Sequence, residues 1–138
     1  MVLDTDVLVA AMRSPKGASA ALLRELDSGN GTLLLNVALA LEYEATCQLT
    51  EHRLAAGLSV GETDSFLNGV IAMAEPVERS FFWRPQLRDP GDEMVLEAAV
   101  NGRAQALVTF NRRDYGTAAQ RFGIEILLPA DALRRIRE

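Results

Sequence analysis

The chain has 138 residues, enough for one domain with a single hydrophobic core. Hydrophobic residues make up 49% of it and the mean hydropathy is close to zero, which is typical of a globular protein. The formal net charge of −5 argues against a protein that binds nucleic acid non-specifically by neutralising phosphates. It leaves open an enzyme whose nucleic-acid substrate is held through bound cations.

Several other classes are excluded by what the chain lacks. A single cysteine, Cys47, cannot form a disulfide within the chain or a cysteine metal site, and the single histidine, His52, disfavours histidine-rich zinc sites and a Ser-His-Asp triad. No apolar run reaches the roughly 20 residues that span a membrane. The N-terminus has no positive region and carries Asp4 and Asp6 within its apolar part. We therefore expect no signal peptide and an intracellular, cytoplasmic protein.

The first half of the chain is predicted to alternate between strands and helices. The first residues, "MVLD" followed by the apolar run 7–12, open as a short buried strand that is apolar on both faces, with Asp4 breaking its end. Residues 18–29 have helical spacing, with Gly29 placed to stop the helix. A second apolar run at 32–36 leads into the next helix.

The rest of the chain continues this alternation. The predicted helices cover residues 37–57, 59–75, 90–100 and 129–138, the predicted strands cover 106–110 and 124–129, and 76–83 is a weaker strand candidate. Short apolar strands alternating with amphipathic helices favour an α/β fold with a central parallel sheet covered on both faces. Ligands of such folds bind beyond the carboxyl ends of the strands.

Two acidic residues are expected at that edge. Asp4 follows the first strand, and Asp114 lies just past the strand predicted at 106–110. A third, Glu42, is six residues after the N-capping Asn36. It falls on a helical stripe with Ala38, Leu41, Ala45 and Leu49, whereas Glu44 falls on the opposite, wet side. We therefore expect Glu42 to face inward, where a carboxylate is costly unless it is paired or metal-bound.

Three further acids crowd the helix start in "QLRDPGDEMVLEAAV", residues 86–100. Asp89 followed by Pro90 indicates an N-cap with proline at the first helical position. Asp92 precedes the core stripe of Val95, Leu96 and Ala99 by three, four and seven residues, so it should face the sheet, although a capping role is an alternative. Glu93 aligns with a more exposed face and is expected to point to solvent.

Asp4, Glu42, Asp92 and Asp114 can thus converge on one crevice at the strand ends. Four carboxylates so close would repel one another or hold protons unless divalent cations relieved the repulsion. Oxygen-only ligation suits Mg²⁺ or Mn²⁺, and two ions about 4 Å apart can activate water and stabilise the leaving oxygen of a phosphodiester. Basic residues also cluster, as Arg112–Arg113 and as Arg134, Arg135 and Arg137, which is the usual pattern of a solvated face or a helix C-terminus.

The ordered set of "VLDTDVLV", Glu42, "DPGDEMVLEAAV" and "ALVTFNRRDY" resembles the PIN-domain family, especially the VapC-like ribonucleases that are toxins of bacterial toxin–antitoxin pairs. The likeness runs from the first residues to about Tyr115 and implies one PIN-like domain over residues 1–138. It implies a three-layer α/β/α sandwich and an endoribonuclease dependent on one or two Mg²⁺ or Mn²⁺ ions. Because the chain offers four acids but no usable general-base histidine and no obvious nucleophile, we expect a metal-bound hydroxide to attack the phosphorus and leave 5′-phosphate and 3′-hydroxyl ends. The metal-binding, catalytic acids would then be Asp4, Glu42, Asp92 and Asp114.

The resemblance is imperfect at two positions. The family often has asparagine where this chain has Asp6, and an acid where it has Asn111, so Asp114 becomes the fourth acid. A shift of one residue in register would put Glu93 in the place of Asp92. Thr5 and Thr109 are candidates to orient the acids or a water molecule, Thr109 being equally compatible with a plain strand residue.

Two rival functions share these features. "VLDTDVLV" also fits the opening of a haloacid-dehalogenase-type phosphatase, but that chemistry needs a lysine far downstream, and Lys16 is the only lysine. A receiver domain lacks the same lysine. A non-catalytic PIN-like interaction module is the other alternative. The resemblance further implies a cognate antitoxin and a homodimer, for which "SFFWRP" at 80–85 and the basic C-terminal helix are weak local hints.

Overall fold

The computed structural model describes residues 1–78, 87 and 89–138. The strands are β1 (Val2–Leu3), β2 (Leu34–Leu35), β3 (Glu75–Pro76), β4 (Ala106–Val108) and β5 (Glu125–Leu127). The helices are α1 (Thr5–Arg13), α2 (Ala18–Asp27), α3 (Val37–Cys47), α4 (Thr50–Ala56), α5 (Val60–Met73), α6 (Pro90–Asn101), α7 (Ala118–Arg121) and α8 (Pro129–Ile136), with a 3₁₀ turn, η1 (Arg112–Tyr115). Of the weak strand candidate at 76–83, the first residue belongs to β3, and the part from 79 on, like the whole of "SFFWRP", lies outside the described residues.

All the strand pairs are parallel, as predicted. β1 and β5 flank β4, and β2 pairs with β3. The two groups meet where Leu34 N–H donates to the carbonyl of Met1 (2.9 Å) and the Met1 ammonium donates to the carbonyl of Thr32 (2.7 Å). The strand order is therefore β3-β2-β1-β4-β5, which reverses direction between β1 and β4. A crevice at such a reversal, beyond the carboxyl ends of the strands, is the usual ligand site of an open α/β sheet.

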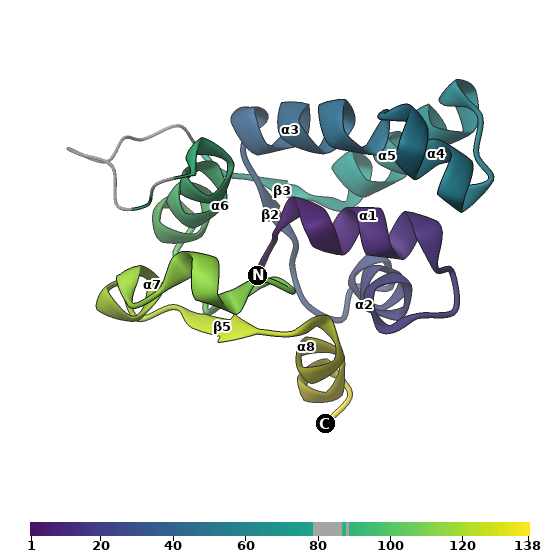
Figure 1. Ribbon diagram of the computed structural model, residues 1–138. Helices are drawn as coiled ribbons and strands as arrows, with labels where there is room; N and C mark the ends of the chain where they lie inside the picture. Colours follow the sequence, from purple (N-terminus) through teal and green to yellow (C-terminus); the bar gives the residue numbers. More distant parts are fainter. Residues whose placement is uncertain (79–86, 88) are drawn as a thin grey trace.

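Helices cover both sides of this sheet, which makes it an α/β sandwich. Figure 1 shows α6 on one side of the strands and α1 and α2 on the other. The first strand residues and the buried side of α6 form the centre of the core, where Leu3, Val95, Leu96 and Leu107 are at most 1% exposed. The packing of α6 on the sheet confirms the predicted core stripe of this helix.

The chain after Asp4 was predicted wrongly. The apolar run 7–12 does not extend a strand but belongs to α1, which begins at Thr5. Its buried residues Val7, Leu8, Ala11 and Met12 are spaced one, three and four residues apart, as expected of one face of a helix. Asp4 therefore lies at a strand-to-helix junction, as the N-cap of α1.

The single helix predicted over 37–57 is two helices, α3 and α4. The chain turns at Leu49, whose ψ of 133° is extended. The Gln48 side chain donates to the carbonyl of Val60 and to Asp64, both at 3.2 Å, and so fixes the end of α3 to α5. Tertiary contacts at this point outweigh the continuous helical pattern of the sequence.

Candidate functional site

Asp4 is a buried acid at the sheet edge. Its backbone N–H still pairs with β4, donating to the Val108 carbonyl at 2.8 Å, which places its side chain beside Thr109. One carboxylate oxygen, Oδ1, accepts from the Thr5 N–H (2.7 Å), and the other, Oδ2, accepts from the hydroxyls of Thr109 (2.7 Å) and Tyr115 (3.0 Å). With only 8% of its surface exposed, Asp4 is a buried carboxylate whose orientation is fixed by three donors.

Thr109 and Tyr115 are the residues that position Asp4. Both are fully buried, and the pKa of the Tyr115 hydroxyl is raised, first by burial and then by the charge of Asp4, so the phenol remains a donor. The predicted supporting position of Thr109 agrees with this contact, and Thr5 contributes through its backbone. Tyr115 was not predicted, although its place one residue after Asp114 lies in the quoted motif "ALVTFNRRDY".

Asp6 faces the same edge from the first turn of α1. Its Oδ2 accepts from the Asn111 side-chain amide (2.8 Å) and the Phe110 N–H (3.1 Å), so it holds the segment that follows β4. The two positions at which the chain departs from the family resemblance, 6 and 111, are thus one hydrogen-bonded pair. Relative to the family pattern, the acid and the amide have exchanged positions, so the negative charge lies on α1 instead of after β4.

Two acids have raised pKa values that show how closely the charges lie. Burial raises the pKa of Asp6 to about 6, with a further contribution from Asp4. Burial likewise raises the pKa of Asp92 to about 6, and the charges of Asp89, Asp4 and Asp114 add to the effect. Asp4 and Asp114 are therefore each within electrostatic range of Asp92.

A cavity of about 460 Å³ contains Asp92 and Asp114 in its wall. Its lining residues are Leu87, Asp89, Asp92, Arg113, Asp114, Tyr115, Gly116, Thr117, Ala118 and Arg121. Asp4 is not in the wall but hydrogen-bonds to Tyr115, which is. Asp114 lies in η1 and is exposed. The cavity thus places two of the four predicted acids on a common surface and a third behind Tyr115.

Glu42, a residue of α3, is not in the wall of this cavity; its side chain lies next to the start of α6. Its Oε1 is 3.9 Å from where a Cβ on Gly91 would be, and it accepts from the Thr46 hydroxyl at 3.3 Å. The stripe predicted to carry it inward was wrong, because Leu41 is 61% exposed, Ala38, Ala45 and Leu49 are exposed as well, and the buried side of α3 is formed by Leu39, Tyr43 and Cys47. Glu42 is half-buried beside that face, and Glu44 is exposed as expected.

The helix start at residues 89–93 separates the three neighbouring acids. Asp89 caps α6, with Oδ1 accepting from the N–H groups of Gly91 (2.7 Å) and Asp92 (3.4 Å). Asp92 takes part in this cap through its backbone, and its half-buried carboxyl group lines the cavity. Glu93 was expected in solvent but is half-buried, because its carboxylate accepts from the Leu87 N–H at 2.8 Å and so holds the approach to the helix.

The donor set suits a hard divalent cation, although the side chains do not close around one point. All the donors are oxygens, and Asp6 Oδ1 is buried with no hydrogen-bond partner in the described chain. In residues 1–78, 87 and 89–138, no three acidic, histidine or cysteine side chains are grouped closely enough to hold one ion. Ligation by Asp4, Asp92 and Asp114 or Glu42 would therefore require side-chain rotation, mainly of the exposed Asp114.

Comparison with known protein families gives a match over most of the chain. The PIN domain family model matches residues 1–113, which include β1, α6, β4 and the acids Asp4, Glu42 and Asp92. No curated protein and no solved structure matches the chain. Within the described residues, no helix is both long and apolar enough to cross a membrane. The chain therefore belongs to the PIN domain family and has the nuclease-type α/β fold of that family.

Proposed function

We propose that this protein is a divalent-metal-dependent endoribonuclease and the toxin of a toxin–antitoxin pair. The observation that carries the proposal is the buried Asp4 carboxylate, fixed by Thr109 and Tyr115 at the point where the sheet order reverses, with Asp92 and Asp114 in electrostatic range. Family membership supports nuclease chemistry in general, and the choice of RNA rests on the resemblance described above.

The residues of the site have separable tasks in this proposal. Mg²⁺ or Mn²⁺ would be held by Asp4, Asp92 and Asp114, with Glu42 as a further candidate, and would neutralise the phosphate and acidify a bound water. Asp4 supplies a ligand position that does not move, because three donors hold it. Asp92 supplies a carboxylate at the cavity wall, and a bound cation would offset the burial and the neighbouring acids that raise its pKa to about 6. Asp6 holds the segment 109–111 in place. Hydrolysis would leave 5′-phosphate and 3′-hydroxyl ends.

The phosphatase alternative loses support from the structure. Asp4, its presumptive nucleophile, is the N-cap of α1, while Lys16 lies beyond the other end of that helix. Nine helical residues separate the two ends by roughly 13 Å. A non-catalytic interaction module is the second candidate, because the carboxylates of the described residues are not grouped around one point.

Incubation of the purified protein with structured and unstructured RNAs tests the nuclease directly. We expect cleavage with Mn²⁺ or Mg²⁺ and none with EDTA, and we expect Mn²⁺ to raise the melting temperature of the wild type, since an ion that binds the native state stabilises it. Asp92→Asn should lose this thermal shift. Cleavage that survives EDTA contradicts the metal requirement, and a thermal shift without cleavage of any RNA or DNA favours the interaction module.

The proposed partners are a cognate antitoxin and a second copy of the chain, both in the cytoplasm. Exposed apolar side chains on α3 support a protein partner, since Val37 is 77% and Leu41 61% exposed beside the half-buried Glu42. Light scattering of the purified protein should give twice the mass of the chain, and Leu41→Asp should reduce that mass if α3 forms the interface. A monomer at all concentrations would contradict the homodimer.

We also propose that residues 1–138 form a single domain. The family model ends at residue 113, but β5 pairs with β4, and Arg137 of the chain end donates to Glu25 of α2 at 3.2 Å. The last part of the chain therefore extends the same sheet and packs on the same helices.

A further inference from the structure

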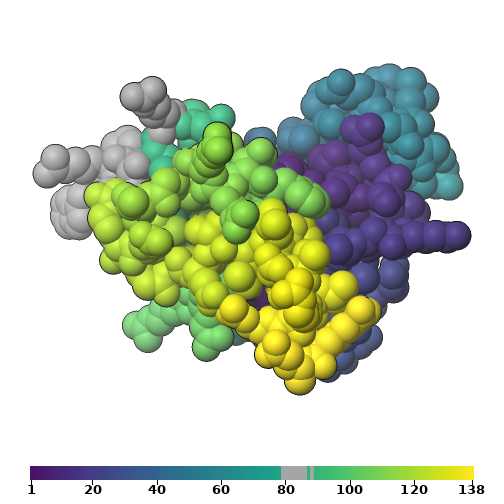
Figure 2. Space-filling view, turned by 60° about the horizontal axis from the view of Figure 1, so that its bottom comes forward, coloured from purple at the N-terminus to yellow at the C-terminus, as the bar shows by residue number. Residues whose placement is uncertain are grey.

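The two basic clusters of the sequence differ in their ion pairs. Arg134, Arg135 and Arg137 each pair with an acid, namely Asp131, Glu125 and Glu25. Arg112, Arg113 and Arg121 form no ion pair with any described residue, and the undescribed residues 79–86 and 88 contain no Asp or Glu. Figure 2 shows both clusters' segments, η1–α7 in yellow-green and α8 in yellow.

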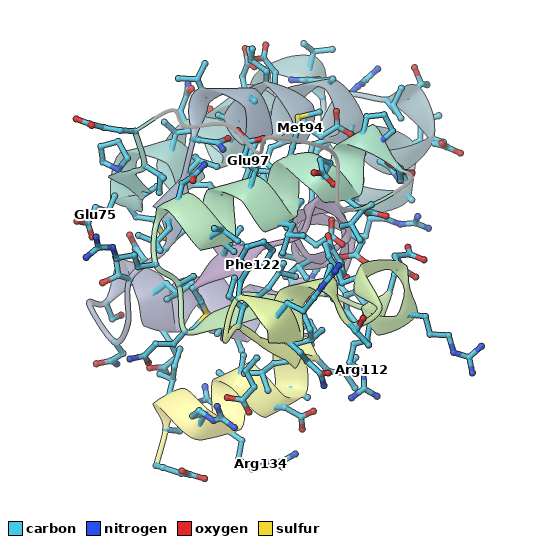
Figure 3. All side chains as sticks on the ribbon, turned by 90° about the vertical axis from the view of Figure 1, so that its left-hand side faces the viewer. Glu75, Met94, Glu97, Arg112, Phe122 and Arg134 are labelled. Carbon is cyan, nitrogen blue, oxygen red and sulfur yellow. The ribbon has the colours of Figure 1, made fainter. Side chains whose placement is uncertain are left out.

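These unpaired arginines lie beside the acids rather than elsewhere. Arg113 and Arg121 line the cavity that contains Asp92 and Asp114. Arg112 and Arg113 line a second, open cavity of about 800 Å³, which extends past Gln120 and along Ile124–Ile126 of the β5 segment. In Figure 3, α6 crosses in front and Arg112 lies below it on the same side of the molecule.

The two cavities share a rim. Arg113 and Gly116 line both, so one surface continues from the acids onto η1 and α7. Gly116 has φ 51° and ψ −128°, a conformation that side chains disfavour, and this turn allows the chain to leave η1 for α7. The shape of the shared rim therefore depends on Gly116, where the backbone without a side chain forms the surface.

The charges along this surface change sign. The first cavity carries Asp89, Asp92 and Asp114 together with two arginines. In the second, the single acid among the described lining residues, Glu125, is already neutralised by the two terminal guanidinium nitrogens of Arg135. Its uncompensated charges are those of Arg112 and Arg113. An acid site that needs cations thus borders directly on a groove that attracts phosphate.

We propose that Arg113 and Arg121 bind the phosphates next to the reacting one, and that Arg112 continues the path of a single nucleic-acid strand into the second cavity. The proposal rests on the proposed nuclease function for the identity of the reacting phosphate. It explains how a chain of net charge −5 retains a polyanion: three arginines act locally where the rest of the molecule repels it. These are positioning residues, since they contact phosphates that do not react.

Binding of a fluorescein-labelled, unstructured oligouridylate, measured by anisotropy at several salt concentrations, tests the path. Every protein carries Asp92→Asn so that cleavage of the RNA is slow during the measurement. Arg113→Gln with Arg121→Gln should weaken binding roughly tenfold or more and flatten the slope of log K against log salt by about 1.4, since two phosphate contacts are lost. Arg113→Lys with Arg121→Lys keeps the charge and should retain most of the affinity.

The matched control is Arg134→Gln with Arg137→Gln, which changes the net charge equally but lies in the paired cluster. Arg112→Gln should weaken the binding of long oligonucleotides and leave the binding of short ones unchanged. Equal losses in the two double variants, or no loss in Arg113→Gln with Arg121→Gln, would overturn the proposed path. If cleavage is absent with every metal while these binding differences appear, the nuclease proposal fails and the strand path stands.

Discussion

Asp92→Asn is expected to lower the rate of RNA cleavage by about 10²–10³-fold, the usual effect of removing one group that stabilises the charge of a phosphoryl or acyl transition state. Asp92 lines the cavity together with Asp89 and Asp114, and its pKa is raised first by burial and then by the charges of Asp89, Asp4 and Asp114. Initial rates with saturating Mn²⁺ measure the effect. The fold should not suffer, because the cap of α6 is made by Asp89.

Asp89→Asn is the matched control for this experiment. It removes one negative charge from the same cavity wall but keeps an N-capping side chain, so cleavage and stability should change little. Asp89→Ala, in contrast, should cost about 1 kcal/mol of stability through loss of the cap. Equal activity losses in Asp92→Asn and Asp89→Asn would show that the charge of the cavity matters rather than Asp92 itself. A larger loss in Glu93→Gln would shift the assignment by one residue.

The stability of the metal-free protein should depend on pH through Asp6. Its pKa is raised from an ordinary 3.8 to about 6 in the folded chain, so the folded state binds the proton more tightly than the unfolded state. The favourable contribution is complete below about pH 4 and is lost as the pH rises through 6. Two pKa units correspond to a ceiling of about 3 kcal/mol, and solvent screening of this half-buried group reduces it to roughly 1–2 kcal/mol.

Urea unfolding in EDTA at pH 4 to 8, for the wild type and Asp6→Asn, measures this contribution. The difference between the two proteins should change across pH 4–7, with the variant gaining stability relative to the wild type at the higher pH. Comparing the pair cancels acids such as Glu25, Glu62 and Glu125, whose lowered pKa values act in the opposite direction. A difference that is independent of pH would show that Asp6 is solvated like an ordinary surface acid.

Patterns that depend on neighbours in the sequence were predicted well. The Asp89–Pro90 start of α6, its buried stripe and the parallel strands follow from local spacing, turn residues and the apolar runs. The edge position of Asp4 was also predicted, because a residue directly after a buried strand lies at the carboxyl edge of a parallel sheet. These features need no knowledge of distant contacts.

The errors arose where tertiary contacts decide. The stripe through Leu41 resembles a core face, yet Leu39 and Tyr43 are among the buried residues of α3. The helix packs against α1, and the Tyr43 hydroxyl donates to the carbonyl of Leu3 in β1. Glu93 aligns with the solvent-facing side of α6 in the sequence, but its carboxylate accepts a hydrogen bond from the backbone N–H of Leu87, a contact that helical spacing does not reveal. Tyr115 gave no periodic signal, since a single aromatic residue in a 3₁₀ turn has no repeat to reveal its burial.

The hydroxyl partners of Asp4 carry a consequence for how the protein is made. Thr109 and Tyr115 follow Asp4 by 105 and 111 residues, so its carboxylate gains its orientation when β4 inserts beside β1. Contacts of such long sequence separation form late, after the entropy of closing the loop has been overcome. A ribosome adds roughly 5–20 residues per second, and the growing chain has no assembled acid site until Tyr115 has been added. For an enzyme proposed to cut RNA, this order delays the chemistry until the segment after β4 has been made and has folded back onto Asp4.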